Sequence, residues 1–104
     1  MVDVREVEPR NGVFRPLTDQ LGVAGFRINQ LELAPGAEGF AHDHAGNDQE
    51  EVYAVVAGSG VLRMGEEEIP LRAGHFVYLP ANVHRQMVAG DEGLTWIGVG
   101  SATE

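Results

Sequence analysis

The sequence predicts an all-β domain, built either as a sandwich or as a closed barrel. The chain of 104 residues carries 14 glycines and five prolines, and these separate short runs rich in Val, Ile, Phe, Tyr and Leu. Such a pattern is typical of short strands joined by turns. No stretch of helical length shows a 3.6-residue apolar period, so the helices that connect parallel strands are missing. Regularly spaced short strands favour a sandwich or barrel.

The expected strands follow one another between residues 26 and 99, and a turn ends each of them. They are Phe26–Leu33, Val52–Ala57, Val61–Met64, Glu68–Leu71, Phe76–Leu79, His84–Val88 and Leu94–Val99. Residues 1–21 precede them as an N-terminal arm, in which Thr18 to Leu21 forms one short turn at most. Closing these strands into a barrel would remove exposed sheet edges, which otherwise promote aggregation.

Composition narrows the class of protein further. The length fits a single domain, residues 1–104, and the 16 acidic and seven basic residues give a net charge of −9. This charge repels nucleic-acid phosphates and anionic lipid, so we expect neither as a partner. The absence of cysteine excludes disulfides and thiolate metal sites. No apolar run approaches the ~20 residues of a membrane span, and the charged N-terminus lacks the apolar region of a signal peptide. We therefore expect a cytoplasmic protein.

Four side chains carry the candidate chemistry. His42 and His44 lie two residues apart, and side chains at that spacing point to the same face of an extended strand. Glu51 begins the next strand after a polar loop, and it reaches the same point if that strand pairs back antiparallel. His84 lies far away in sequence after a proline turn, and the opposite wall of a barrel would bring it close.

The chain resembles the cupin family in its two signature motifs. The first is Gly36, five residues, His42-Asp43-His44, then Glu51, six residues and Gly58; the second is Gly74, five residues, Pro80-Ala81-Asn82-Val83-His84. The resemblance covers residues 36–88. It implies a cupin-like double-stranded β-helix, that is, a jelly-roll barrel of the cupin type 2 class. It also implies a homodimer and one divalent metal ion held by His42, His44, Glu51 and His84.

The chain departs from the family pattern at both motifs. In the second motif, Asn82 stands where the family has glycine, and the interval from Pro80 to His84 is one residue shorter. Asn tolerates the left-handed conformation better than most residues, so the turn itself is compatible with Asn82. In the first motif, the interval from His44 to Glu51 is two or three residues longer than usual.

The longer interval makes Glu50 a rival for the role of metal-binding carboxylate. Glu51 is favoured because its six-residue interval to Gly58 fits the motif, and because alternation places it on one face with Tyr53. Tyr53 and Gln86 are weak candidates for contact with a substrate, and Glu50 is the weak candidate for a general base. For Tyr53, core packing is an equally good explanation. Outward-facing Val52, Ala54 and Val56 offer a surface for a second copy.

Two functions fit these residues. Three imidazoles and one carboxylate suit Mn, Fe, Co, Ni, Cu or Zn, and affinity alone does not choose among them. The first hypothesis is a small metal-dependent enzyme, a dioxygenase, isomerase or lyase, acting on a small polar organic molecule. The alternative is a non-catalytic module of the same fold that binds a small molecule or a metal. The fold does not decide between them.

Overall fold

The computed structural model describes residues 1–43, 46 and 48–102. In this part of the chain the elements are η1 (Val4–Glu6), β1 (Phe14–Pro16), α1 (Thr18–Leu21), β2 (Phe26–Leu33), β3 (Glu51–Met64), β4 (Glu67–Arg72), β5 (Phe76–Leu79) and β6 (Arg85–Ser101). All strand pairs are antiparallel. The predicted all-β jelly roll is confirmed. No helix among these elements has the length and apolar character needed to cross a membrane.

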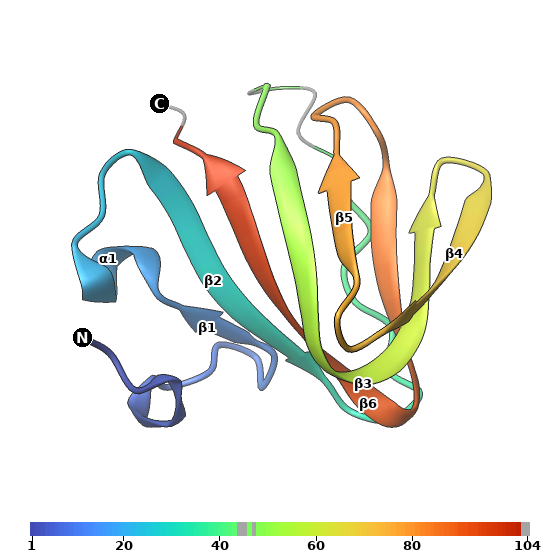
Figure 1. Ribbon diagram of the computed structural model, residues 1–104, viewed down its shortest axis with the longest axis horizontal. Coiled ribbons are helices and arrows are strands. Elements are labelled where there is room, and N and C mark those ends of the chain that lie inside the picture. The colour runs from blue at the N-terminus through green and yellow to red at the C-terminus, as the bar shows by residue number, and fades with distance from the viewer. Residues whose placement is uncertain (44–45, 47, 103–104) are drawn as a thin grey trace.

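The two longest strands, β3 and β6, build both walls of the barrel. Each runs down one wall, bends at the base and rises along the other wall (Figure 1). The sequence predicted two separate strands in each of these regions, because glycines interrupt both. The pairing in fact continues through the bend, with register shifts between Val55 and Ala57 and between Gly58 and Gly60. Gly58 has a φ of 78°, and a Cβ there would lie 2.0 Å from the carbonyl oxygen of Gly93. Only glycine fits at position 58, where the backbones of β3 and β6 come this close.

The strand order places one half of β6 in each wall. The path through the sheet is β1-β2-β6-β3-β4, and β5 pairs with the first half of β3. Residues 37–42 extend the wall that contains residues 85–89 of β6, because Glu38 bridges to Val88 and His42 bridges to Arg85. Segments far apart in sequence, around residues 42, 51, 85 and 98, are thereby brought to one end of the barrel.

The core fills the space between the two walls. Alternate residues of β3 and β6 point inward and are buried, as the period of two in a strand requires. The buried apolar residues of this cluster are Leu33, Tyr53, Val55, Leu62, Leu71, Leu79, Met87, Ala89, Leu94 and Trp96. These side chains supply the hydrophobic stabilisation that holds the two walls together.

The N-terminal arm packs against the barrel rather than extending from it. β1 pairs with β2, and the guanidinium of Arg15 lies 2.7 Å from the carboxylate of Glu32 across this pair. Val7 is buried. The predicted short turn over Thr18 to Leu21 is confirmed as α1, which ends at Gly22 in the left-handed conformation.

Candidate functional site

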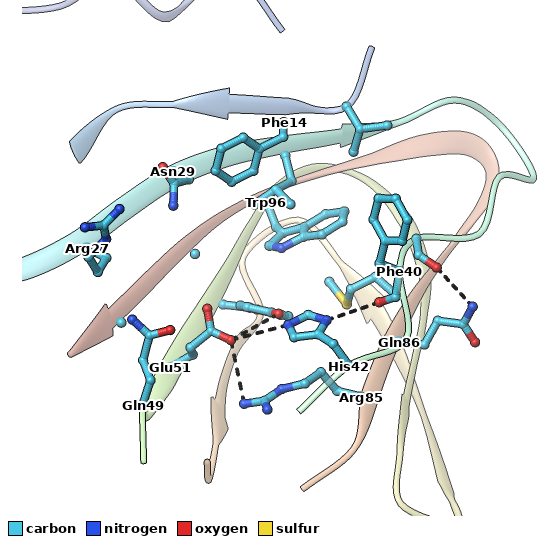
Figure 2. Close-up of a pocket in the computed structure, with 17 residues that line it drawn as sticks. Phe14, Arg27, Asn29, Phe40, His42, Gln49, Glu51, Arg85, Gln86 and Trp96 are labelled. Atoms are coloured by element: carbon cyan, nitrogen blue, oxygen red, sulfur yellow. Dashed lines mark hydrogen bonds and ion pairs between the residues drawn. The ribbon is translucent and has the colours of Figure 1, made fainter. Parts of the chain in front are cut away.

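A cavity of about 400 Å³ opens at the end of the barrel where these segments meet. Figure 2 shows Arg27 and Asn29 on one side of it, Glu51 and Gln49 at the polar end, Trp96 in the middle and Phe40 at the other end. Gly98 and Gly100 of β6 leave room because they have no side chains. The residues around the cavity are Val13, Phe14, Arg27, Asn29, Leu31, Gly39, Phe40, His42, Gln49, Glu51, Tyr53, Arg85, Gln86, Met87, Trp96, Gly98 and Gly100.

Glu51 is the centre of the polar network in this cavity. It begins β3 between Leu79 of β5 and Gly100 of β6, and its side chain is 15% exposed. Its Oε1 accepts a hydrogen bond of 3.4 Å from the Tyr53 hydroxyl. The same oxygen lies 3.7 Å from Nη2 of Arg85 and 3.9 Å from Nε2 of His42. One carboxylate is therefore surrounded by a phenol, a guanidinium and an imidazole.

His42 reaches Glu51 because its backbone pairs with that of Arg85. The two residues exchange hydrogen bonds of 2.9 and 2.8 Å, and directly paired residues place their side chains on the same side of a sheet. Nδ1 of His42 lies 3.2 Å from the carbonyl oxygen of Phe40, and Nε2 faces Glu51. The Glu51 carboxylate raises the pKa of His42 above its usual value, burial opposes this effect, and the Phe40 carbonyl adds to it. The arrangement favours the imidazolium, which donates from both nitrogens.

Arg85 lies beneath Glu51 with a fully buried side chain. Its Nη1 donates 3.0 Å to the carbonyl oxygen of Val83, and its Nη2 donates 3.2 Å to that of Pro80 and 3.4 Å to that of Leu79. The guanidinium therefore holds the turn before β6 closed. Its Nε is buried without a hydrogen-bond partner in the described chain. The three carbonyl oxygens and the Glu51 carboxylate offset the free-energy cost of burying the guanidinium charge.

His84 lies on the other side of the barrel wall. Its side chain is 62% exposed, and its Nδ1 lies 3.7 Å from the carboxylate of Asp43, the residue that follows His42. In the first part of β6, residues 85–90, the buried residues are Arg85, Met87 and Ala89. The sequence predicted that His84 and Gln86 point inward, but Arg85 and Met87 are the buried residues. The strand is shifted by one residue from the expected register, and such a shift exchanges its two faces.

Gln86 and Glu50 also differ from the expected arrangement. Gln86 borders the cavity, but its side chain binds the carbonyl oxygen of Gly39 and the guanidinium of Arg63. Glu50 accepts a hydrogen bond of 2.7 Å from Tyr78 on the exposed side of the sheet. Of the two adjacent glutamates, Glu51 is the one that faces His42.

Among the described residues, the structure brings only part of the predicted metal-binding set together. His42 and Glu51 come together, His84 does not join them, and His44 lies outside the described residues. Within residues 1–43, 46 and 48–102, no group of three His, Asp or Glu side chains is arranged to hold a metal ion. Arg85 occupies the place next to Glu51, and a permanent cation there opposes a divalent ion.

Tyr53 packs in the core, which is one of the two explanations that the sequence left open, and its contact with a substrate stays a prediction. Its ring is buried and packs against Trp96, with ring centroids 5.9 Å apart. Burial raises the pKa of its phenol well above the ordinary value, and the neighbouring Glu51 charge adds to this shift. The hydroxyl stays protonated and orients the Glu51 carboxylate. The sequence motifs did not indicate Arg27 or Arg85 as site residues, although Arg85 lies five residues after Pro80.

Comparison with known proteins agrees with this fold and its two motifs. The family model described as the cupin domain matches residues 29–100, which is most of the chain. The chain belongs to the cupin family. Comparison with curated proteins gives no match.

Several solved cupin structures superpose closely. A cupin protein from Bacteroides fragilis is 24% identical, with a TM-score of 0.80 and coverage of 98% of this chain and 86% of that one. A sugar phosphate isomerase of the cupin superfamily from Silicibacter pomeroyi is 25% identical, with a TM-score of 0.81 and coverage of 97% and 74%. A protein described as a predicted oxalate decarboxylase from Thermotoga maritima is 19% identical, with a TM-score of 0.81 and coverage of 98% of each chain.

Proposed function

We propose that this cupin binds a small polar organic molecule in the cavity beside Glu51. The observation that carries the proposal is the cavity itself, which has a polar network at one end and an apolar wall at the other (Figure 2). Its volume of about 400 Å³ lies within the range of small-molecule sites. Such sites combine a mostly apolar lining with a few polar groups that orient the ligand.

The charges around the cavity favour a ligand with an anionic end. Glu51 is balanced by the buried guanidinium of Arg85. Arg27 also borders the cavity and is exposed, and its side chain makes no hydrogen bond or ion pair with a described residue. Its guanidinium is therefore available to bind a carboxylate or a phosphate in a two-point geometry. The isomerase from Silicibacter pomeroyi, at 25% identity, is also named for an anionic small molecule.

Of the two functions expected from the sequence, the arrangement of the site favours the binding module. A metal-dependent enzyme requires the full ligand set, and His84 faces away from it. Binding requires only the cavity, the free guanidinium of Arg27 and the apolar surface of Trp96 and Phe40. The cytoplasmic location remains a prediction from the cysteine-free composition.

Trp96 provides a direct test, because it is the only tryptophan in the chain and borders the cavity. We expect small organic carboxylates and phosphates to change its fluorescence in a saturable way, and the matched neutral amides and alcohols to bind more weakly. Arg27→Gln should weaken the response to the anions. Arg72→Gln, at an exposed arginine away from the cavity, is the matched control and should leave it unchanged. The proposal fails if no compound in the panel changes the fluorescence or the melting temperature.

We further propose that a second copy of the chain covers the outer face of the sheet at β5. Tyr78 pairs with Val52, and Phe76 pairs with Ala54, so their side chains form two adjacent rows. Phe76 is 75% exposed and Tyr78 54% exposed. In the described chain β5 pairs only with β3, which leaves its other edge open. Pairing β5 with the same strand of another copy would bury both aromatic rings and satisfy the open edge.

A further inference from the structure

Arg85 occupies the position where the cupin pattern places its last histidine. The interval from Pro80 to His84 is one residue shorter than in the family, and Arg85 restores the count. The geometry agrees with this interval, because Arg85 pairs with His42 and shares its face. The side chain of His84 is exposed instead, and it lies 3.7 Å from the carboxylate of Asp43. The residue that points at Glu51 from this wall is therefore an arginine.

The guanidinium of Arg85 is built into the wall. Its side chain has no exposed surface, and three backbone carbonyls accept its hydrogen bonds. Nη2 lies 3.7 Å from Oε1 of Glu51, where the positive charge balances the carboxylate. A guanidinium does not lose its proton in proteins, so this charge is permanent. It cannot act as a metal ligand, because it has no lone pair to offer.

We propose that this cupin functions without a metal ion, and that the guanidinium of Arg85 supplies the positive charge opposite Glu51. A divalent ion held by His42 and Glu51 would face this fixed cation, and like charges repel. In the described part of the chain, no third His, Asp or Glu completes a site. Metal binding and binding of the small organic molecule are tested separately, so failure of one proposal leaves the other unaffected.

The first test measures metal directly in the wild-type chain. The untagged protein is equilibrated with Mn²⁺, Co²⁺, Ni²⁺ or Zn²⁺, desalted and analysed for metal content. We expect trace metal and no change in melting temperature with or without chelator. Stoichiometric metal that is lost in His42→Ala would overturn the proposal. A second measurement needs no variant: Mn²⁺ should leave the ring signals of His42 in the NMR spectrum sharp, and selective broadening of these signals would count against the proposal.

The second test asks whether the side chain at position 85 determines metal binding. Arg85→His places an imidazole on the face of His42 and Glu51, and we expect it to bind close to one ion per chain with a rise in melting temperature that chelator reverses. Arg85→Gln removes the charge without adding a ligand and should bind only trace metal. Arg10→His, on the exposed arm, controls for an added histidine and should do the same. A folded Arg85→His protein that takes up no metal would show that Arg85 does not stand in the place of the ion. If Arg85→His does not fold, the metal content and the NMR signals of the wild-type protein still test the proposal.

Discussion

Nη2 of Arg85 lies 3.7 Å from Oε1 of Glu51, and these two side chains come from different strands that meet at one end of the barrel. The pair joins the turn before β6 to the start of β3, because Arg85 also binds the carbonyls of Val83 and Pro80. Tyr53 and His42 approach the same carboxylate oxygen. The ion pair therefore holds two strands together beside the cavity, and loss of either charge should destabilise the fold.

Removing the charge of Glu51 should destabilise the protein strongly. In Glu51→Gln the buried guanidinium of Arg85 keeps its charge and loses its counter-charge. Breaking a buried pair in this way costs about 3–5 kcal/mol in free energy of unfolding. Urea denaturation of both proteins measures the difference. Glu50→Gln, at the exposed neighbouring glutamate, is the matched control and should lose much less. Equal losses in the two variants would contradict the role of the buried pair.

The titration of His42 should depend on Glu51. The carboxylate raises the pKa of His42 above the ordinary 6.5, so protonated His42 stabilises the folded state. This stabilisation is complete below the pKa of the unfolded chain and is lost as the pH rises through the higher pKa of the folded protein. NMR titration of the His42 ring should give a raised pKa in the wild type and a lower one in Glu51→Gln. An unchanged pKa of His42 in Glu51→Gln would contradict the coupling.

Filling the cavity at Gly98 should block ligand binding. A Cβ at Gly98 would lie 3.5 Å from Tyr53 and 3.8 Å from Leu31, which are ordinary contact distances. Gly98→Val therefore fits the strand, and its side chain occupies space that borders the cavity. We expect loss of the Trp96 fluorescence response to any compound that binds the wild type, with a similar melting temperature. Gly25→Val, where a Cβ meets nothing within 4 Å, should leave the response intact. A full response in Gly98→Val would mean that the ligand binds elsewhere.

Placing a charge on β5 should prevent association. Phe76→Glu puts a carboxylate on the exposed row next to Ala54, where the proposed second copy would bury it. Sedimentation analysis should show a dimer for the wild type and a monomer for this variant. Phe40→Glu, at an equally exposed aromatic residue near the cavity, is the matched control and should remain a dimer. A monomeric wild type would remove the basis of this proposal.

The sequence predicted the strands well and the strand ends less well. Phe26–Leu33 and Phe76–Leu79 are predicted with the bounds that the structure has, because Gly and Pro mark their turns. The glycines at 58 and 60 also indicated a turn, yet β3 continues through them. Glycine permits a sharp bend without ending the ladder of hydrogen bonds, and only the pairing with β6 shows which of the two occurs.

The amino-acid sequence by itself determined the fold class and the cupin motifs, because periodicity and turn residues are local properties. It also predicted that His42 and Glu51 approach each other if their segments pair, and the two side chains do come together. Only the tertiary structure decided that Arg85, rather than His84, faces Glu51. The backbone pairing of His42 with Arg85 sets this register, and a shift of one residue reverses every side chain of a strand. Long-range pairing therefore turned an expected metal ligand outward and placed a fixed positive charge in the cavity.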